Sequence, residues 1–292
     1  MKIVRKSNKK PKLSLILLDW DCRESYHIFD YLKEQINHDF EVIWIEYYKK
    51  FPKELQKKNI DTWIILEFDK SFYYHKHLMY NIGTFYANGE IVVIMDSDVM
   101  LKETFTDSII KEFEKDENII LHLDEFRNIN PKYYPFNYPT FEEFMDNGCK
   151  NCIKNLTKGL YYRVDPIHTL NWGACFCAKR DDILAIGGAD EHIDYLGHIC
   201  GPYEMSFRLR NLSKKIKWVD YEFLYHTWHP GTDGEDNYLG PHDGKNFSLK
   251  ALELLDSNRI QPYLINKGIK ELDENKLCLN SKNWKKEKLC IK

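Results

Sequence analysis

Residues 89–99 read Gly89-Glu90-Ile91-Val92-Val93-Ile94-Met95-Asp96-Ser97-Asp98-Val99. The five apolar residues 91–95 are rich in β-branched side chains and predict a buried central strand of a parallel sheet. Ligands in open α/β sheets bind beyond the carboxyl ends of such strands. Asp96 and Asp98 lie two residues apart at that end, so an extended chain points both carboxylates the same way. Their repulsion predicts a divalent cation or a hydroxyl-rich ligand between them. A polar strand end that caps a helix is the alternative.

Strands and helices alternate on both sides of this stretch, as the periodicity of apolar residues indicates. The alternation predicts an α/β fold with a mostly parallel central sheet flanked by helices. Long loops are expected at 128–147 and 230–246, where aromatic, Gly, Asp and Asn residues replace the periodic pattern. Strands are expected at 13–18, 40–45, 62–66, 119–123, 172–178 and 217–225, and helices at 24–36, 77–87, 103–115, 179–186, 204–212 and 248–255.

The length of 292 residues fits one large domain at 12–250 with a basic tail at 1–11 and a helical or irregular C-terminal extension at 251–292. A net charge of -3 argues against nucleic-acid binding over the whole surface. No apolar run has the length of a membrane span, and the basic start lacks the apolar core of a signal peptide. We therefore expect a cytoplasmic protein, with contact of the basic tail to the inner face of a membrane as the alternative. Cys149 and Cys152 lack the second pair that a zinc site needs, so free thiols are expected.

Several motifs follow one another along the chain. They are Asn81-x-Gly83, Gly89-Glu90, Asp96-Ser97-Asp98, Gly187-Gly188-Ala189-Asp190-Glu191, Tyr203-Glu204-x-x-x-Arg208-x-Arg210 and His226-Thr227-Trp228-His229. In this order they resemble the nucleotide-diphospho-sugar glycosyltransferases of the GT-A fold, most closely the large inverting family 2. The resemblance covers about residues 12–250 and departs from the family at Ala189, Tyr203 and Ser206, and at Glu204, where the family usually has Asp.

The resemblance implies a metal-dependent transfer with inversion at the sugar. Asp98 is the first expected ligand of Mn²⁺ or Mg²⁺, with Asp96 and a neutral imidazole from His226 or His229 as further ligands. A divalent ion neutralises a leaving diphosphate without proton transfer. Glu204 stands where the family keeps its general base, which takes the proton of the acceptor hydroxyl. A solvated helix-face pair with Arg208 is the other interpretation of Glu204.

The same resemblance assigns contacts to the substrates. The donor is expected to be a UDP-sugar, and the acceptor a hydroxyl of a glycan or glycoconjugate. Trp172 is expected to stack on a sugar, with a core position as the alternative. Expected donor contacts are Asp19, Trp20, Glu46, Asp96, Asp98, Asn171, Trp172 and Gly173, and expected sugar or acceptor contacts are Asp190, Glu191 and Trp172.

Two other functions remain open at this point. Asp19-Trp20-Asp21 after the first strand resembles the nucleophile loop of haloacid-dehalogenase-like phosphatases, although Arg23 stands where that family has Thr or Val. The departures at Tyr203 and Ser206 also fit a degenerate GT-A protein that binds nucleotide-sugar or glycan without turnover.

Overall fold

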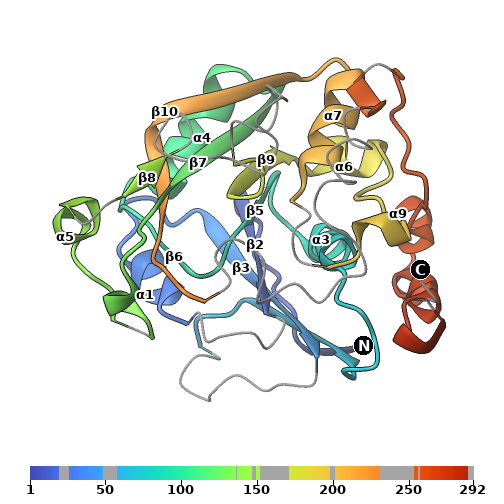
Figure 1. The fold of residues 1–292 in the computed structure, drawn as a ribbon. Helices are drawn as coiled ribbons and strands as arrows, with labels where there is room; N and C mark the ends of the chain where they lie inside the picture. Colours follow the sequence, from blue (N-terminus) through green and yellow to red (C-terminus); the bar gives the residue numbers. More distant parts are fainter. Residues whose placement is uncertain are drawn as a thin grey trace.

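The computed structural model describes residues 1–19, 26–48, 58–135, 137–146, 149–151, 171–197, 201–230, 253–255 and 257–288. Within these residues the centre of the molecule is a ten-stranded sheet with the order β1-β4-β3-β2-β5-β9-β7-β10-β6, and β8 pairs with β7 (Figure 1). The strands are β1 Lys2–Arg5, β2 Leu13–Asp19, β3 Phe40–Tyr48, β4 Thr62–Phe68, β5 Ile91–Met95, β6 Val99–Met100, β7 Ile119–Arg127, β8 Lys150–Asn151, β9 Cys175–Lys179 and β10 Lys215–His226.

The direction of the strands determines where their ends meet. Strands β4, β3, β2 and β5 run parallel, and β10 runs parallel to β7. Between these two groups lies β9, which is antiparallel to both β5 and β7. Consequently β7 and β10 point the same way as β2, β3 and β5, and the carboxyl ends of all five reach the same edge of the sheet. The predicted α/β fold with a mostly parallel centre is confirmed, whereas the reversed direction of β9 was not predicted.

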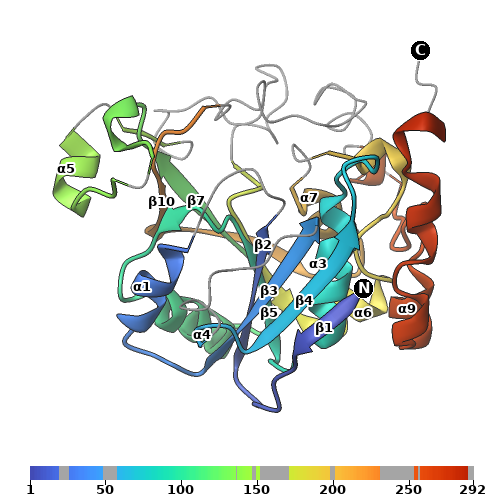
Figure 2. The same ribbon diagram turned by 90° about the horizontal axis from the view of Figure 1, so that it is seen from below.

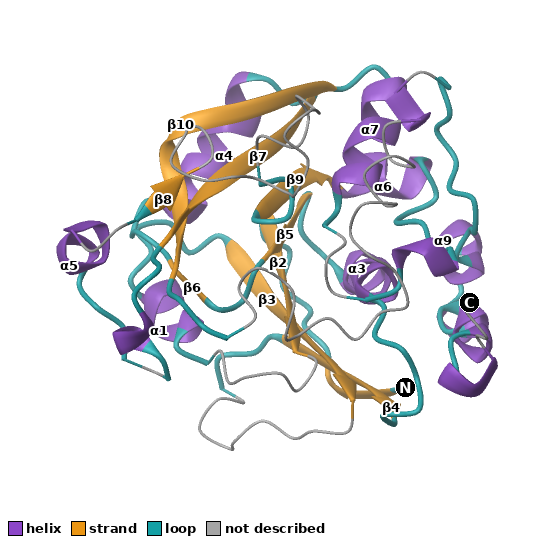
Figure 3. Cartoon of the chain, viewed as in Figure 1, coloured by secondary structure: helices purple, strands orange, loops and turns teal. Residues whose placement is uncertain are grey.

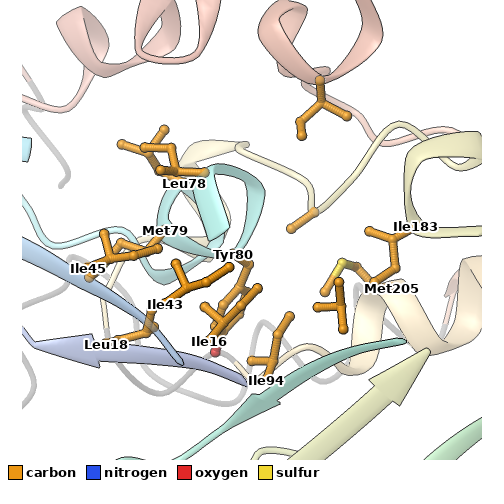
Figure 4. Packing of buried hydrophobic residues seen from close by; sticks show 14 of the residues in the cluster. Ile16, Leu18, Ile43, Ile45, Leu78, Met79, Tyr80, Ile94, Ile183 and Met205 are labelled. Carbon is orange, nitrogen blue, oxygen red and sulfur yellow. The ribbon is translucent and has the colours of Figure 1, made fainter. Parts of the chain in front are cut away.

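Alternation along the strands sends side chains to two apolar layers, as the pleat requires. Ile16 of β2 and Ile94 of β5 pack against α3, α6 and α7 on one face (Figure 4). Leu15 and Val93 pack against α1 and α4 on the other face. The helices therefore cover both faces of the sheet (Figures 2 and 3). The helices are α1 Ile28–Lys33, α3 Lys76–Tyr86, α4 Phe105–Lys115, α5 Phe141–Asp146, α6 Arg180–Ala185, α7 Tyr203–Asn211 and α9 Lys267–Glu271.

Close packing of α3 on the sheet explains one glycine of the motifs. A Cβ atom at Gly83 would lie 2.6 Å from side-chain carbons of Ile16 in β2. Only a residue without a side chain lets the helix approach the strand this closely. The Asn-x-Gly spacing thus serves the packing between α3 and β2.

Both ends of the described chain pack against the rest of the domain. Residues 2–5 of the expected basic tail form β1, which pairs antiparallel with β4 at the sheet edge. The expected C-terminal extension is part of the main core, since Ile269, Leu277 and Trp284 are buried in the same apolar layer as α3. The loop expected at 128–147 contains the 3₁₀ helix η1 Pro131–Tyr133 and helix α5.

The expected loop at 230–246, beyond Pro230, and most of the expected helix at 248–255 lie outside the described residues. Among the described residues, no helix combines the length and apolar character needed to cross a membrane.

Candidate functional site

Acidic side chains gather at the edge where the carboxyl ends of the strands meet. Asp19 closes β2, and its backbone partner in β3 is Glu46. Asp96 and Asp98 follow β5, and Glu125 lies near the end of β7. Because β2, β3, β5 and β7 end at the same edge of the sheet, the fold brings these five carboxylates to that edge. This is the place where open α/β sheets bind ligands.

The short strand β6 brings a histidine to the acids. It pairs antiparallel with β10, and Val99 lies opposite His226. Asp98, one residue before Val99, is therefore placed beside His226. His229 follows three residues later, and both histidines are buried. Asp98, His226 and His229 form the one cluster of metal-ligating side chains found among the described residues, and we call it the triad.

The geometry of the triad suits a metal ion. Nε2 of His226 lies 3.4 Å from Oδ1 of Asp98, and Nε2 of His229 lies 3.4 Å from Oδ2. The two Nε2 atoms are 3.3 Å apart. Ligand atoms that each lie about 2.0–2.2 Å from one ion are separated by roughly 3.0–3.5 Å, so the observed spacings match a common centre.

The second nitrogen of His229 is held by the backbone. Nδ1 lies 2.8 Å from the carbonyl oxygen of Pro230. A carbonyl only accepts, so Nδ1 carries a proton and donates it; in the neutral ring, Nε2 then has the lone pair that a metal ion would need. A hydrogen bond of this kind fixes the tautomer of metal-ligating histidines.

The electrostatics of the edge also favour a cation. Burial lowers the pKa of His226, but Asp98 and Glu125 raise it by more, so that the net shift is upward. Burial raises the pKa of Asp96 to about 6; Lys76 opposes this shift, and Asp98 reinforces it. The carboxylates thus stabilise positive charge at the triad, and a divalent cation would supply such a charge.

Lys76 belongs to this edge and was missed by the sequence analysis. Its ammonium lies 4.0 Å from Asp96 and is mostly buried. It is the first residue of α3, whose N-terminal end carries a partial positive charge. A lysine among loop-like residues gives no periodic signal, so only the fold shows that it faces the acids. It is suited to bind an anionic group beside the triad.

The predicted nucleotide contacts at the ends of β2 and β3 lie at this edge but are mostly covered. Asp19 and Glu46 are both buried. Glu46 accepts a hydrogen bond of 2.7 Å from the indole of Trp44. Trp20 lies outside the described residues, as does Asp21 of the phosphatase-like motif.

The segment before β9 reaches the same edge because β9 runs in the opposite direction. Asn171 donates to Glu125 at 2.7 Å and accepts from the backbone N–H of Gly173 at 3.1 Å. Trp172 differs from its expected sugar-stacking role. Its ring packs against His122, Phe207 and Trp218, and only 5% of the residue is exposed. It therefore has a core position, the alternative that the sequence left open.

The Gly-Gly-Ala-Asp-Glu turn holds the C-terminal segment. Asp190 accepts hydrogen bonds from the backbone N–H groups of Tyr263 and Leu264 at 2.6 and 2.9 Å. Glu191 is fully buried, and the amides of three asparagines donate to its carboxylate. These asparagines are Asn81, Asn266 and Asn280. Both acids were expected to bind sugar hydroxyls, but in this structure their oxygens are engaged by the protein.

Glu204 also has an environment that differs from the expected one. It is 0% exposed, and its Oε2 accepts from Nε of Arg208 at 2.7 Å. Oε1 accepts from the backbone N–H of Asp190 at 3.0 Å. The guanidinium of Arg208 also donates to the carbonyl oxygens of Ile186 and Gly188. A general base needs an oxygen within reach of the acceptor hydroxyl, so this geometry supports a structural role for Glu204.

No family model and no curated protein matches the chain. Its fold is similar to that of the mannosyltransferase PcManGT from Pyrobaculum calidifontis in complex with GDP-Man and Mn²⁺, with a TM-score of 0.50 and 11% identity over 77% of this chain. It is also similar to residues 1–349 of S. aureus TarS in complex with UDP-GlcNAc, with a TM-score of 0.51 and 13% identity over 93% of this chain and 74% of that chain. This chain spans 59% of the mannosyltransferase, less than two thirds of its length. At these identities the likeness establishes a shared fold, and the expected glycosyltransferase fold is confirmed.

Proposed function

We propose that the protein is a metal-dependent glycosyltransferase that moves a sugar from a nucleoside diphosphate donor to a hydroxyl of a glycan or glycoconjugate. The observation that carries the proposal is the triad of Asp98, His226 and His229 at the ligand-binding edge of this fold. Two solved structures of the same fold hold nucleotide-sugars, one together with Mn²⁺. The sequence resemblance favours UDP as the nucleotide.

The roles divide between the two sides of the triad. The ends of β2 and β3, with Asp19 and Glu46, form the side proposed for the nucleoside. Asp98, His226 and His229 would hold the ion, with Asp96 as a further oxygen ligand. Bound there, a divalent ion supplies positive charge to the diphosphate. Lys76 binds the same phosphate oxygens from the N-terminal end of α3 and so keeps the leaving group in place.

Two statements about the reaction remain predictions: that it inverts the anomeric centre of the sugar, and which residue is the general base. Inversion requires a group that accepts the proton of the attacking hydroxyl on the side away from the diphosphate. The sequence assigns this role to Glu204, and the buried ion pair with Arg208 argues against it. The effect of Glu204→Gln on the free energy of unfolding separates the two roles.

A thermal-shift panel with UDP, GDP, dTDP and CMP, each with and without Mn²⁺, tests the proposal. A ligand that binds only the folded protein raises Tm by mass action. We expect one nucleotide to raise Tm only when Mn²⁺ is present. Asp98→Asn should abolish that shift, whereas Asp220→Asn, the same change at an exposed position of β10, should retain it.

Three other outcomes count against parts of the proposal. A shift that is equal with and without Mn²⁺ would remove the metal requirement. A metal-dependent shift without any release of nucleoside diphosphate from UDP-GlcNAc or GDP-Man would favour the degenerate binding protein. The absence of any shift, together with hydrolysis of a phosphate monoester, would favour the phosphatase.

A further inference from the structure

Two large aromatic side chains lie partly exposed next to the triad and have no role in the site described so far. Trp228 stands between the two ligand histidines in sequence and is partly exposed, although its neighbours are buried. Tyr134, just after η1, is 41% exposed. The rings meet edge to face, with centroids 6.0 Å apart and planes at 87°. We call Tyr134 and Trp228 the aromatic pair.

The segment that carries Tyr134 is anchored to the triad. The backbone N–H of Asn128 donates to the carbonyl oxygen of His226 at 2.9 Å. The side-chain amide of Asn128 donates to the carbonyl oxygen of Phe144 at 2.7 Å, which ties the segment to α5. Farther along, Tyr138 stacks on His27 with ring centroids 3.7 Å apart. These contacts anchor the chain on both sides of Tyr134, which lowers the entropy lost when a ligand binds.

The topology places the aromatic pair away from the proposed nucleoside side, next to the triad. The ends of β3 and β2 lie before β5 in the sheet order, and β7 and β10 lie beyond it. Asp98 follows β5 but leads into β6, which pairs with β10, so that the triad, Tyr134 after β7 and Trp228 after β10 all lie beyond β5. In a displacement with inversion, the attacking hydroxyl approaches opposite the leaving diphosphate. A donor whose nucleoside lies at β2 and β3 therefore takes its acceptor from the side of β7 and β10.

The chemistry of the aromatic pair indicates what kind of acceptor fits. An indole and a phenol offer a large apolar face with a polar edge. The axial C–H groups of a pyranose form an apolar face of similar size, while its hydroxyls remain at the rim for water or polar groups. Trp172, the residue for which the sequence suggested this role, is buried in the core. Tyr134 and Trp228, in contrast, are partly exposed and lie beside the triad.

We propose that the aromatic pair is the acceptor subsite and that it binds a pyranose ring of the acceptor through stacking, which makes the acceptor a carbohydrate. This inference rests on the proposed function. It specifies the acceptor side, which the metal triad and the nucleotide contacts leave open.

Saturation-transfer NMR with cellobiose and N,N′-diacetylchitobiose, in the presence of UDP and the diamagnetic ion Mg²⁺, tests the subsite. We expect saturation of the ring C–H protons of at least one disaccharide. Tyr134→Ala should weaken its binding about tenfold, the loss expected when one ring face is no longer buried. Tyr134→Phe should keep the affinity, because stacking needs the ring and not the hydroxyl. Tyr221→Ala, a control at an exposed tyrosine of β10, should match the wild-type chain.

The Tm shift by UDP with Mg²⁺, measured on the same samples, separates the two proposals. If that shift is present and neither disaccharide is saturated, or if Tyr134→Ala binds as tightly as the wild-type chain, the subsite is wrong and the proposed function stands. If no nucleotide in the panel shifts Tm, the proposed function fails, whatever the sugars show. A Tyr134→Phe variant as weak as Tyr134→Ala would assign the effect to the hydroxyl and overturn stacking.

Discussion

Glu204 and Arg208 bury a carboxylate and a guanidinium together, four residues apart on α7. Both side chains are fully covered, and the guanidinium also donates to carbonyl oxygens of the Gly-Gly turn. The i,i+4 spacing that joins exposed residues on many helices here joins a buried pair. From the sequence alone, the two cases look the same.

At the residue scale, Glu204→Gln should destabilise the protein by about 3–5 kcal/mol, because it leaves the buried charge of Arg208 uncompensated. Urea unfolding measures the change. Replacing both residues, Glu204→Gln with Arg208→Met, should recover part of the loss. Asp30→Asn, which breaks the exposed pair with Lys33, should leave stability almost unchanged. A Glu204→Gln variant as stable as the wild-type chain but without turnover would instead restore the general-base assignment.

At the scale of elements, α3, the turn at 187–191 and α7 interlock. Asn81 on α3 accepts from the N–H of Ala189 at 2.7 Å and donates to its carbonyl oxygen at 2.9 Å. Gly188 has a φ of 71°, in the left-handed region. A Cβ atom there would lie 2.2 Å from Oδ1 of Asn81. The motif residues that resemble the family are therefore also the residues that join these elements.

Gly188→Ala should lower the free energy of unfolding by at least about 1–2 kcal/mol, since the left-handed conformation and the contact with Asn81 both oppose a side chain. Gly173→Ala is the matched control, because its Cβ atom would meet no atom closer than 3.4 Å. The midpoints of urea unfolding for the two variants give the comparison. Equal midpoints would show that the turn tolerates rearrangement.

At the scale of the whole molecule, the C-terminal segment closes the fold over α3. In Figure 1 the segment after residue 257 runs beside α3, and Trp284 is buried in the same layer. Glu191 connects the segment to the turn through Asn266 and Asn280. Burial raises the pKa of Glu191 to about 7, against the hydrogen bonds of Asn266 and Asn81.

This upward shift predicts how stability depends on pH. The folded-state pKa lies above the unfolded value, so the contribution of Glu191 is fully present below about pH 4.5 and is lost as pH rises through about 7. The difference between the two limits is on the order of 3 kcal/mol. Urea unfolding at pH 5 and at pH 8 measures this loss. Between these two pH values, the free energy of unfolding should fall less for Glu191→Gln than for the wild-type chain, because Gln cannot ionise. An equal loss in the variant and the wild-type chain would show that groups other than Glu191 cause the pH dependence.

The local pattern of the chain was enough to predict most of the sheet and the edge of it at which Asp96 and Asp98 lie. Continuous apolar runs predicted the buried strands β2, β3, β4, β5 and β7, because a strand covered on both faces must be apolar along its length. Asp96 and Asp98 follow such a run, and a strand end in an open α/β sheet lies where ligands bind. These signals depend on neighbouring residues and are present in the sequence itself.

Tertiary structure alone decided which side chains meet and which are covered. The pairing of β6 with β10 brings Asp98 to His226 and His229, far along the chain, and the reversal of β9 brings Asn171 to Glu125. The same packing buries Glu204 and Glu191 and leaves Tyr134 and Trp228 partly exposed. Strand order and burial result from competition among all elements for one core, whereas helix and strand periodicity is imposed by the backbone within a few residues. The sequence by itself therefore determined the class of fold and the chemistry available at its edge, and the three-dimensional packing decided which of those residues are free to use it.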